Sequence, residues 1–264
     1  MSDSTADQTF WEHLDDFRST IIHIICVTVV CGIVAFIFKE ALFSVVLAPA
    51  DSGFVTYRLM DGLASLTGGA VNGFKIDLIN TSLAQQFIIH MKTALYAGLL
   101  GALPYTLYEL LRFISPAFYA AEKRYIYSLV SIGYVMFVLG VLLCYFLIFP
   151  FTFRFLGTYQ VSAEVVNMIS LDSYISTFVS MCLMLGVVFE LPLLCWLLAK
   201  LGMLKAKFMS NYRKHAVVAI LVAAAIITPT SDVFTLALVS VPMWLLYEIS
   251  IKVVASTKPI KLEI

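Results

Sequence analysis

Hydrophobic positions gather into six long runs along the chain, and within each run they are consecutive instead of alternating with polar positions. The runs cover residues 20–38, 86–111, 125–149, 172–200, 215–228 and 232–254. A helix needs about 20 apolar residues to cross a hydrocarbon core of about 30 Å, whereas the strands of a membrane barrel alternate with a period of two. The pattern therefore predicts an all-α, polytopic integral membrane protein with six transmembrane helices.

The composition supports a lipid environment for most of the chain. Of the 264 residues, 61% are hydrophobic and 13% are charged, whereas soluble domains have about 45 to 50% apolar residues. This composition excludes a water-soluble globular protein and a disordered chain. The 17 Lys and Arg are balanced by 17 Asp and Glu, so the chain lacks the net basic charge that is typical of nucleic-acid binding.

The positions of Lys and Arg predict the orientation, because these residues concentrate in cytoplasmic segments. With a cytoplasmic N-terminus, the inner segments hold twelve of them: Arg18, Arg112, Lys123, Arg124, Lys200, Lys205, Lys207, Arg213, Lys214, Lys252, Lys258 and Lys261. The outer segments hold four: Lys39, Arg58, Lys75 and Arg154. We therefore expect both termini in the cytoplasm.

No internal repeat or separate soluble domain interrupts the runs. We expect one membrane domain over 1–264, with an interfacial helix in 1–19, an external cap loop in 39–85, and cytoplasmic loops in 111–124 and 200–214. The fifth run would reach only about 21 Å, and a tight turn at 229–231 leads into the sixth. These two runs predict a short hairpin with short fifth and sixth helices.

Individual residues predict local features of the spans. Pro192 should bend the long fourth span by removing a backbone donor. Asp232 should cap the first turn of the sixth helix. Small residues on one side of a helix allow close approach of a neighbour, and two such packing faces are expected at Ala97, Gly98, Gly101 and Ala102, and at Ala216, Ala219 and Ala223.

Ionisable residues within a span cost at least about 2.5 kcal/mol at the bilayer centre unless they are shielded. Lys92 lies near the outer end of its helix and can extend to the surface, and Glu248 can pair with Lys252 four residues on. Glu190 has no cation three or four residues away. It must face a polar cavity, find a partner on another helix, or be protonated. Two roles for Glu190 are compatible with its position: a functional acid, or a buried group that forms a structural hydrogen bond.

The N-terminal segment is amphipathic and acidic. If residues 9–21 are helical, Phe10, Leu14 and Phe17 share one face, and Glu12 and Asp16 project from the other. Helices that lie on membranes usually carry Lys and Arg, so these acids indicate a cationic guest. Two carboxylates at i and i+4 can each take one guanidinium group. A solvated acidic face is the alternative.

The order of motifs along nearly the whole chain, from about His13 to Lys252, resembles the TatC family, the multi-span core subunit of the twin-arginine protein translocase. The resemblance rests on a His-Leu-x-Glu-Leu-Arg-like start at His13 to Arg18, Ala48-Pro49, Phe113-Ile114-x-Pro116-Ala117-x-Tyr119 with Glu122 and Arg124, Phe189-Glu190-x-Pro192, Thr228-Pro229 with Asp232-Val233-Phe234, and Pro242 with Tyr247-Glu248. Two positions depart from the family pattern: Asp16 replaces the usual Glu, and Phe17 replaces the usual Leu. Because Asp16 is one methylene shorter, Glu12 or Asp15 could share its role.

The resemblance implies a concave, glove-like bundle in the cytoplasmic (inner) membrane of a prokaryote. It implies a receptor, with no catalytic residue, cofactor or metal, that binds twin-arginine signal peptides of folded cargo for export driven by the proton-motive force. It also implies self-association and single-span partners of the TatA and TatB type. The implied signal-binding residues are Asp16, Glu122, Arg18, Phe113, Arg124 and Glu12, and other functional positions are Pro49, Pro104, Glu190 and Asp232.

Two other functions compete with this one. A secondary transporter would use Glu190 as an ion or proton site at the bend, although the chain shows no inverted repeat. An intramembrane enzyme would need a nucleophile or metal motif, and His-Glu-x-x-His and Gly-x-Ser-x-Gly are both absent from the sequence. The four histidines have no ligand spacing, which makes a metal site improbable.

Overall fold

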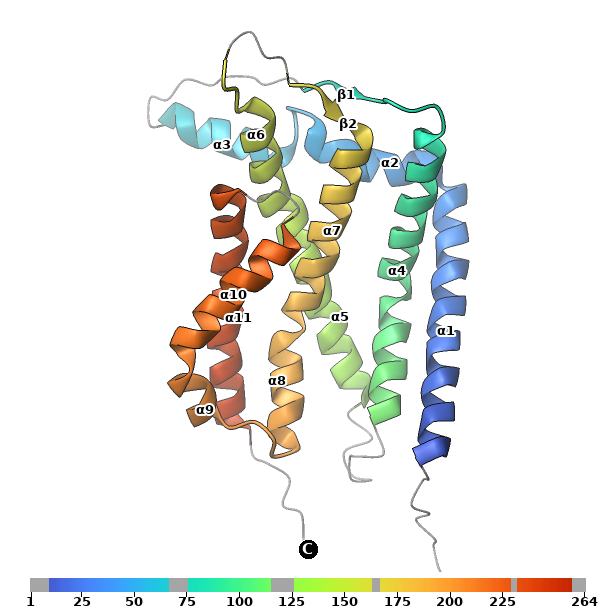
Figure 1. Ribbon diagram of the computed structural model, residues 1–264, viewed down its shortest axis with the longest axis vertical. Helices are drawn as coiled ribbons and strands as arrows, with labels where there is room; N and C mark the ends of the chain where they lie inside the picture. The colour runs from blue at the N-terminus through green and yellow to red at the C-terminus, as the bar shows by residue number, and fades with distance from the viewer. Residues whose placement is uncertain (1–9, 67–75, 115–125, 163–166, 229–231, 258–264) are drawn as a thin grey trace, which may run out of the picture. The chain divides into compact units, whose positions relative to one another are not determined.

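The computed structural model describes residues 10–66, 76–114, 126–162, 167–228 and 232–257. Within these ranges the chain is largely helical (Figure 1). It divides into two compact units, the first formed by Met1–Leu42 and His90–Tyr134, and the second by Phe43–Ile89 and Val135–Ile264.

The described elements follow one another as a chain of helices with one small pair of strands. In order they are α1 (Phe10–Ile37), α2 (Lys39–Leu47), the short 3₁₀ turn η1 (Ala48–Ala50), α3 (Val55–Leu66), β1 (Leu78–Ile79), α4 (Gln85–Ile114), α5 (Ile126–Leu143), the π-helical turn η4 (Cys144–Ile148), α6 (Phe149–Thr158), β2 (Ile169–Ser170), α7 (Leu171–Phe189), α8 (Leu191–Lys200), α9 (Ala206–Asn211), α10 (Arg213–Ile227) and α11 (Val233–Ser256).

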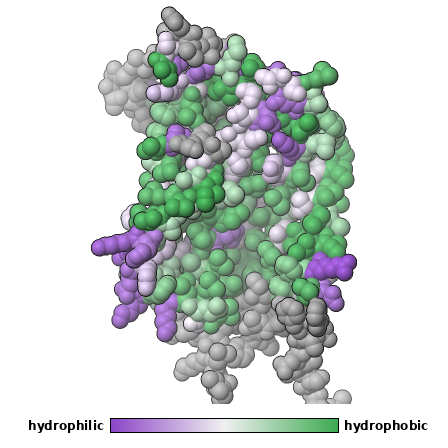
Figure 2. All heavy atoms as spheres, in the orientation of Figure 1, coloured by the Kyte–Doolittle hydropathy of each residue, from purple (hydrophilic) through white to green (hydrophobic). Residues whose placement is uncertain are grey.

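Five helical stretches in the described residues are long and apolar enough to cross a membrane: Leu14–Ile37, Gln85–Phe113, Tyr127–Thr158, Leu171–Lys200 and Val233–Ser256. They coincide with five of the six predicted runs, so the chain is a polytopic membrane protein. The remaining run forms α10, whose 15 residues extend about 22 Å, so the prediction of a short fifth helix is confirmed. The prediction of a short sixth helix is wrong, because α11 has 24 residues. Figure 2 shows a surface that is mostly hydrophobic, with hydrophilic residues concentrated toward the helix ends.

Residues 10–21 are helical, as the sequence predicts, but they do not form a separate element. They continue without a break into the first span, so that α1 has 28 residues. No proline or glycine falls between Phe10 and Cys31 to interrupt it. The orientation of this first stretch along a membrane surface therefore stays a prediction.

In the first unit, α1 and α4 lie side by side (Figure 1). Gly98 of α4 faces Gly32 of α1 so closely that a Cβ atom at Gly98 would lie 2.6 Å from the Gly32 Cα atom. Ala102 is almost fully buried. The predicted packing face is therefore confirmed at Gly98 and Ala102, whereas Gly101 is exposed. At the other end of the contact, the His90 Nε2 atom lies 3.1 Å from the carbonyl oxygen of Phe36, and the two rings stack.

In the second unit, the fourth span breaks where the sequence predicts a bend. The helix α7 ends at Phe189, Glu190 joins it to α8, and Pro192 lies in the first turn of α8. The helix α11 packs against α8 and α10. On α10 the prediction for the small residues is wrong at Ala219, which is exposed, while Ala224 is fully buried. The buried side of this short helix therefore lies at its C-terminal end.

The segment 39–85, predicted as a loop, contains the helices α2 and α3. Side chains fix it to other parts of the second unit: the Thr56 hydroxyl donates to the Phe146 carbonyl, and the Tyr145 hydroxyl donates to the Val45 carbonyl. Two residues of this segment also form a parallel pair of strands, in which Leu78 lies opposite Ile169. The segment is therefore a packed part of the fold.

Candidate functional site

The first turns of α1 and the last turn of α4 meet at an aromatic contact. The Phe17 and Phe113 ring centroids lie 5.4 Å apart, and Phe17 still exposes 43% of its surface. Asp16 and Arg18, on either side of Phe17 in sequence, are both exposed. The structure thus brings three of the predicted signal-binding residues, Asp16, Arg18 and Phe113, to one end of the first unit.

A cavity of about 270 Å³ adjoins this end of α1. Its lining residues recur every three or four positions and so share one face of the helix: Asp15, Arg18, Ser19, Ile22 and His23. The lining includes both an acidic side chain, Asp15, and a basic side chain, Arg18. The sequence-based alternative that Asp15 shares the role of Asp16 is compatible with this geometry.

Two of the predicted signal-binding residues, Glu122 and Arg124, lie outside the described residues. The backbone of Glu12 belongs to α1, but its side chain is not described. The juxtaposition of Asp16 with Glu122 therefore stays a prediction. The C-terminal end of α4 lies next to Phe17. The predicted loop 111–124 begins at this end.

Sequence reasoning missed an acid in this region. Glu109 lies within the second predicted run and is only 6% exposed. Its Oε1 atom is 3.8 Å from the Nη1 atom of Arg112, and Tyr105 stands one helical turn before it in α4. The signal was present, because an acid inside a span costs free energy unless it is paired, and Arg112 stands three residues on.

Glu190 is another acid within a span, at the junction of α7 and α8. Both of its carboxylate oxygens are buried, and neither has a hydrogen-bond partner among the described residues. The structural hydrogen bond considered from the sequence is therefore not found in this part of the chain. A buried carboxyl group without donors is costly as an anion, which leaves the protonated form or a group supplied by a guest.

Pro49, a predicted functional position, is buried in the turn η1. The Tyr57 hydroxyl lies 2.9 Å from the Pro49 carbonyl oxygen and 3.2 Å from that of Pro150. Burial raises the pKa of Tyr57 above its ordinary range, although the Arg154 guanidinium acts in the opposite direction. Tyr57 therefore remains a protonated donor, and it ties the turn at Pro49 to the start of α6.

Two other predicted positions have clear local roles. Asp232 caps α11, because its Oδ1 atom accepts a hydrogen bond of 2.7 Å from the Thr235 backbone N–H; the predicted capping is confirmed. Pro104 lies inside α4, which continues past it to Ile114. The expected pair of Glu248 with Lys252 is wrong: Glu248 pairs with Arg213 at 2.9 Å and so joins α11 to α10.

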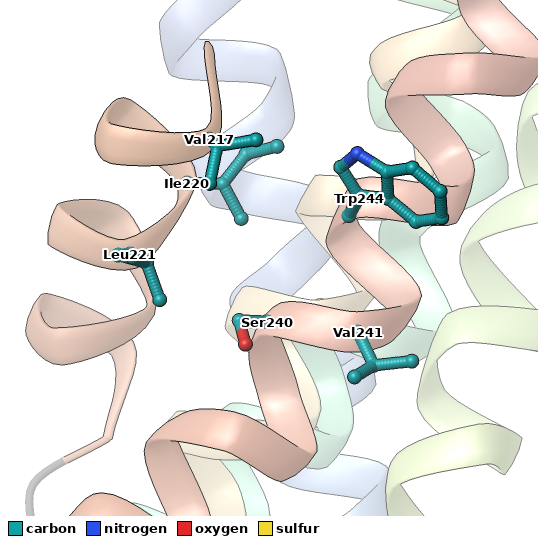
Figure 3. Close-up of a pocket in the computed structure, with 6 residues that line it drawn as sticks. All are labelled: Val217, Ile220, Leu221, Ser240, Val241 and Trp244. Atoms are coloured by element: carbon teal, nitrogen blue, oxygen red, sulfur yellow. The ribbon is translucent and has the colours of Figure 1, made fainter. Parts of the chain in front are cut away.

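An apolar groove of about 300 Å³ lies between α10 and α11. Figure 3 shows the side chains from the two helices that line it: Val217, Ile220, Leu221, Ser240, Val241 and Trp244. Ser240 is the polar member of the lining, and its hydroxyl donates to the Ala237 carbonyl. The groove offers apolar surface and no acid or base.

The described ends of α1 and α4 carry side chains that can bind a guest. No group of three or more His, Cys, Asp and Glu side chains in those ranges is arranged to hold a metal ion. The ends of α1 and α4 combine acids, arginines and aromatic rings, a set that can recognise guanidinium groups through paired hydrogen bonds and ring contacts.

A family model described as Sec-independent protein translocase protein (TatC) matches residues 12–242. The chain belongs to the TatC family. A TatC of Blattabacterium sp. subsp. Periplaneta americana (strain BPLAN) is 31% identical over 257 residues, which cover 95% of this chain and 96% of the relative. TatC is a non-enzymatic component of a protein translocase.

Solved TatC structures agree in fold. A crystal structure of the twin arginine translocase receptor TatC is 31% identical and superposes with a TM-score of 0.73, covering 92% of this chain and 98% of that one. A second TatC structure, in DDM, is 30% identical with a TM-score of 0.75 and covers 91% and 98%. The family membership predicted from the motifs is confirmed, and it does not favour the secondary transporter.

Proposed function

We propose that this chain is the receptor subunit of a twin-arginine translocase and binds the signal peptides of folded cargo at its cytoplasmic face. Asp16 and Glu122 take the two guanidinium groups. The residues around them are Arg18, Phe113, Arg124 and Glu12. In this proposal six helices form a glove-like bundle in the inner membrane, with both termini in the cytoplasm, and the chain assembles with copies of itself and with TatA-type and TatB-type partners for export driven by the proton-motive force.

The observation that carries the proposal is the contact between Phe17 and Phe113. It joins the acidic start of α1 to the end of α4, where the loop with Glu122 begins. Because Asp16 precedes Phe17 directly, the contact brings one of the two proposed acids to the base of the loop that holds the other. An acidic α1 alone would also fit a solvated face.

The energetics require both a charged and an apolar part of the guest. An exposed ion pair contributes only about 0 to 1 kcal/mol, so two arginines alone bind weakly. Bidentate hydrogen bonds to carboxylates distinguish guanidinium from ammonium and thus supply specificity. The apolar segment of a signal peptide, at about 0.8 kcal/mol per buried methylene, supplies most of the affinity. A protonated Glu190 then offers a polar contact to the guest or to a partner helix.

The test is a photo-crosslinking or binding assay with the full chain in lipid nanodiscs, using a twin-arginine signal peptide and its twin-lysine variant. We expect tighter capture of the twin-arginine peptide, and weaker capture by Asp16→Ala and Glu122→Ala while both variants stay inserted. Glu40→Gln, which changes an exposed acid in the first turn of α2, is the matched control. Equal capture of both peptides by the unaltered chain would remove the receptor proposal.

A further inference from the structure

Glu109 is a third candidate carboxylate at the end of the first unit that holds Asp16 and Phe113. Resting on the receptor function proposed above, we propose that Glu109 binds one guanidinium group of the guest, and that Arg112 occupies this position when no guest is bound. Arg112 is then an internal competitor whose displacement is part of signal-peptide binding.

Three side chains of α4 form this position. Tyr105, Glu109 and Arg112 stand at i, i+4 and i+7 and therefore share one face of the helix. Glu109 is buried, with 7% of its side chain exposed, whereas the Arg112 side chain is 67% exposed. The arginine thus lies on the solvent side of the acid. It can leave without disturbing the core.

The carboxylate of Glu109 has unused hydrogen-bonding capacity. An ionised carboxylate can accept about four hydrogen bonds. The nearest Arg112 nitrogen lies 3.8 Å from the Glu109 Oε1 atom, which is too distant for a hydrogen bond. Charge-assisted N–H···O hydrogen bonds are about 2.7 to 2.9 Å long. Arg112 is held three residues along the same helix, which limits how its guanidinium group can approach Glu109. A guanidinium group of the guest approaches from solvent without this restraint, and it can therefore form the two short hydrogen bonds that Arg112 does not form.

The register between α1 and α4 gives the separation of Glu109 and Asp16 along the helix pair. Phe17 lies opposite Phe113, and Gly32 lies opposite Gly98, so the two helices run antiparallel with a constant register. Glu109 is four residues from Phe113, and Asp16 is one residue from Phe17 in the opposite direction. At a rise of 1.5 Å per residue, the two acids are separated by about 7.5 Å along the helix axes.

That spacing fits a pair of neighbouring arginines. Consecutive Cα atoms are 3.8 Å apart, and the long side chains can spread their guanidinium groups to about twice that distance. One arginine can reach Asp16 at the exposed end, while Glu109, one turn deeper, can share the guanidinium group of the other with Glu122, since a guanidinium group has five N–H donors. A lysine at the deeper position would be a poorer ligand, since its ammonium group cannot form the planar, two-pronged contact.

An internal competitor has a measurable consequence. Since Arg112 must leave before the guest binds, the apparent affinity is lower than the intrinsic affinity by the fraction of chains in which Glu109 is open. Removing the Arg112 charge should therefore tighten capture of the twin-arginine peptide, by about two- to fivefold for an exposed pair. A residue that merely supports the fold would weaken capture on substitution, which is the opposite sign.

The experiment measures the dissociation constants of fluorescent twin-arginine and twin-lysine peptides for the full chain in nanodiscs. We expect Arg112→Gln to tighten binding of the twin-arginine peptide, and Glu109→Gln to weaken it by about tenfold and to lower the preference for arginine over lysine. The double variant should bind like Glu109→Gln alone, because the competitor no longer matters once its acid is gone. Lys252→Gln, an exposed cation on α11, controls for the loss of positive charge.

The outcomes separate this inference from the receptor function. If the unaltered chain prefers arginine and Asp16→Ala weakens capture, but Arg112→Gln leaves binding unchanged or weaker, Glu109 is a structural acid and this inference alone fails. Equal weakening of both peptides by Glu109→Gln would have the same meaning. If the unaltered chain does not distinguish the two peptides, the receptor function itself fails. If the Glu109→Gln variant does not insert into the membrane, the Arg112→Gln variant still tests the inference. Tighter binding of the twin-arginine peptide by that variant supports it, and unchanged or weaker binding contradicts it.

Discussion

Gly98→Ala tests the close contact between α1 and α4. The added Cβ atom would lie 2.6 Å from the Gly32 Cα atom and 2.7 Å from the Thr28 carbonyl oxygen. Carbon atoms pack best at about 3.5 to 4.0 Å, so the helices must separate by about 1 Å. The obstacle is backbone, which cannot rotate away. Overpacking of this kind costs about 1 to 3 kcal/mol of unfolding free energy.

Two other glycines of the same helix pair provide matched controls. An added Cβ at Gly101 would meet only the Cys31 Cβ atom at 3.8 Å, and one at Gly32 would meet the Ala94 carbonyl oxygen at 3.5 Å, both ordinary contacts. Alanine is favoured over glycine inside a helix by about 1 kcal/mol. Gly101→Ala and Gly32→Ala should therefore be neutral or slightly stabilising. Because all three variants gain the same helix propensity, the unfolding free energy of Gly98→Ala should be lower than that of either control by the overpacking cost of about 1 to 3 kcal/mol.

The assay is reversible unfolding in mixed micelles, followed by the loss of helical circular dichroism as the denaturing detergent increases. Signal-peptide capture should fall in parallel, because separation of α1 from α4 also moves Phe17 away from Phe113. If Gly98→Ala is as stable as Gly101→Ala, the two helices do not pack at the described distance, and the register used to relate Asp16 to Glu109 is wrong.

Three further variants test other parts of the structure. Tyr57→Phe removes the donor shared by two buried carbonyl groups, and it should lower the unfolding free energy by about 1 to 3 kcal/mol in the same micelle assay; stability equal to the unaltered chain would show that the hydroxyl is not needed. Asp232→Ala should cost about 1 kcal/mol while Asp232→Asn, which keeps an acceptor at the cap, costs less; equal losses would contradict the capping role. Glu190→Leu should raise the thermal midpoint, because it removes a buried carboxyl group without partners, and it should reduce export in a cargo-transport assay; normal export would assign Glu190 to structure only.

The spans could be predicted from the sequence because apolar runs report directly on burial in lipid. The break at Glu190 and the cap at Asp232 were also predictable, since proline and an acid at a helix start act through local chemistry. These features need no knowledge of the neighbouring helices. For the same reason the motifs could indicate the family before any packing was known.

Features that depend on packing could not be predicted. From spacing alone Lys252 was the available partner for Glu248, but Arg213 of another helix takes that place. The helices α2 and α3 were expected to be a loop, and they are held by contacts such as that of Tyr57 with Pro150, 93 residues away in sequence. The contact between helices at the candidate site also depends on packing. The motifs indicate Phe113 and Phe17 separately, but their contact arises only when α1 and α4 pack together.

The pairing of β1 with β2 has a mechanical consequence. It consists of two residues from the connection between α3 and α4 and two from the connection between α6 and α7, and a ladder this short has little stability of its own in water. It persists only because helices on both sides hold its ends in register. Each connection therefore stabilises the position of the other. An insertion or deletion beside Leu78 would break its pairing with Ile169 and so loosen the segment around Ile169 as well.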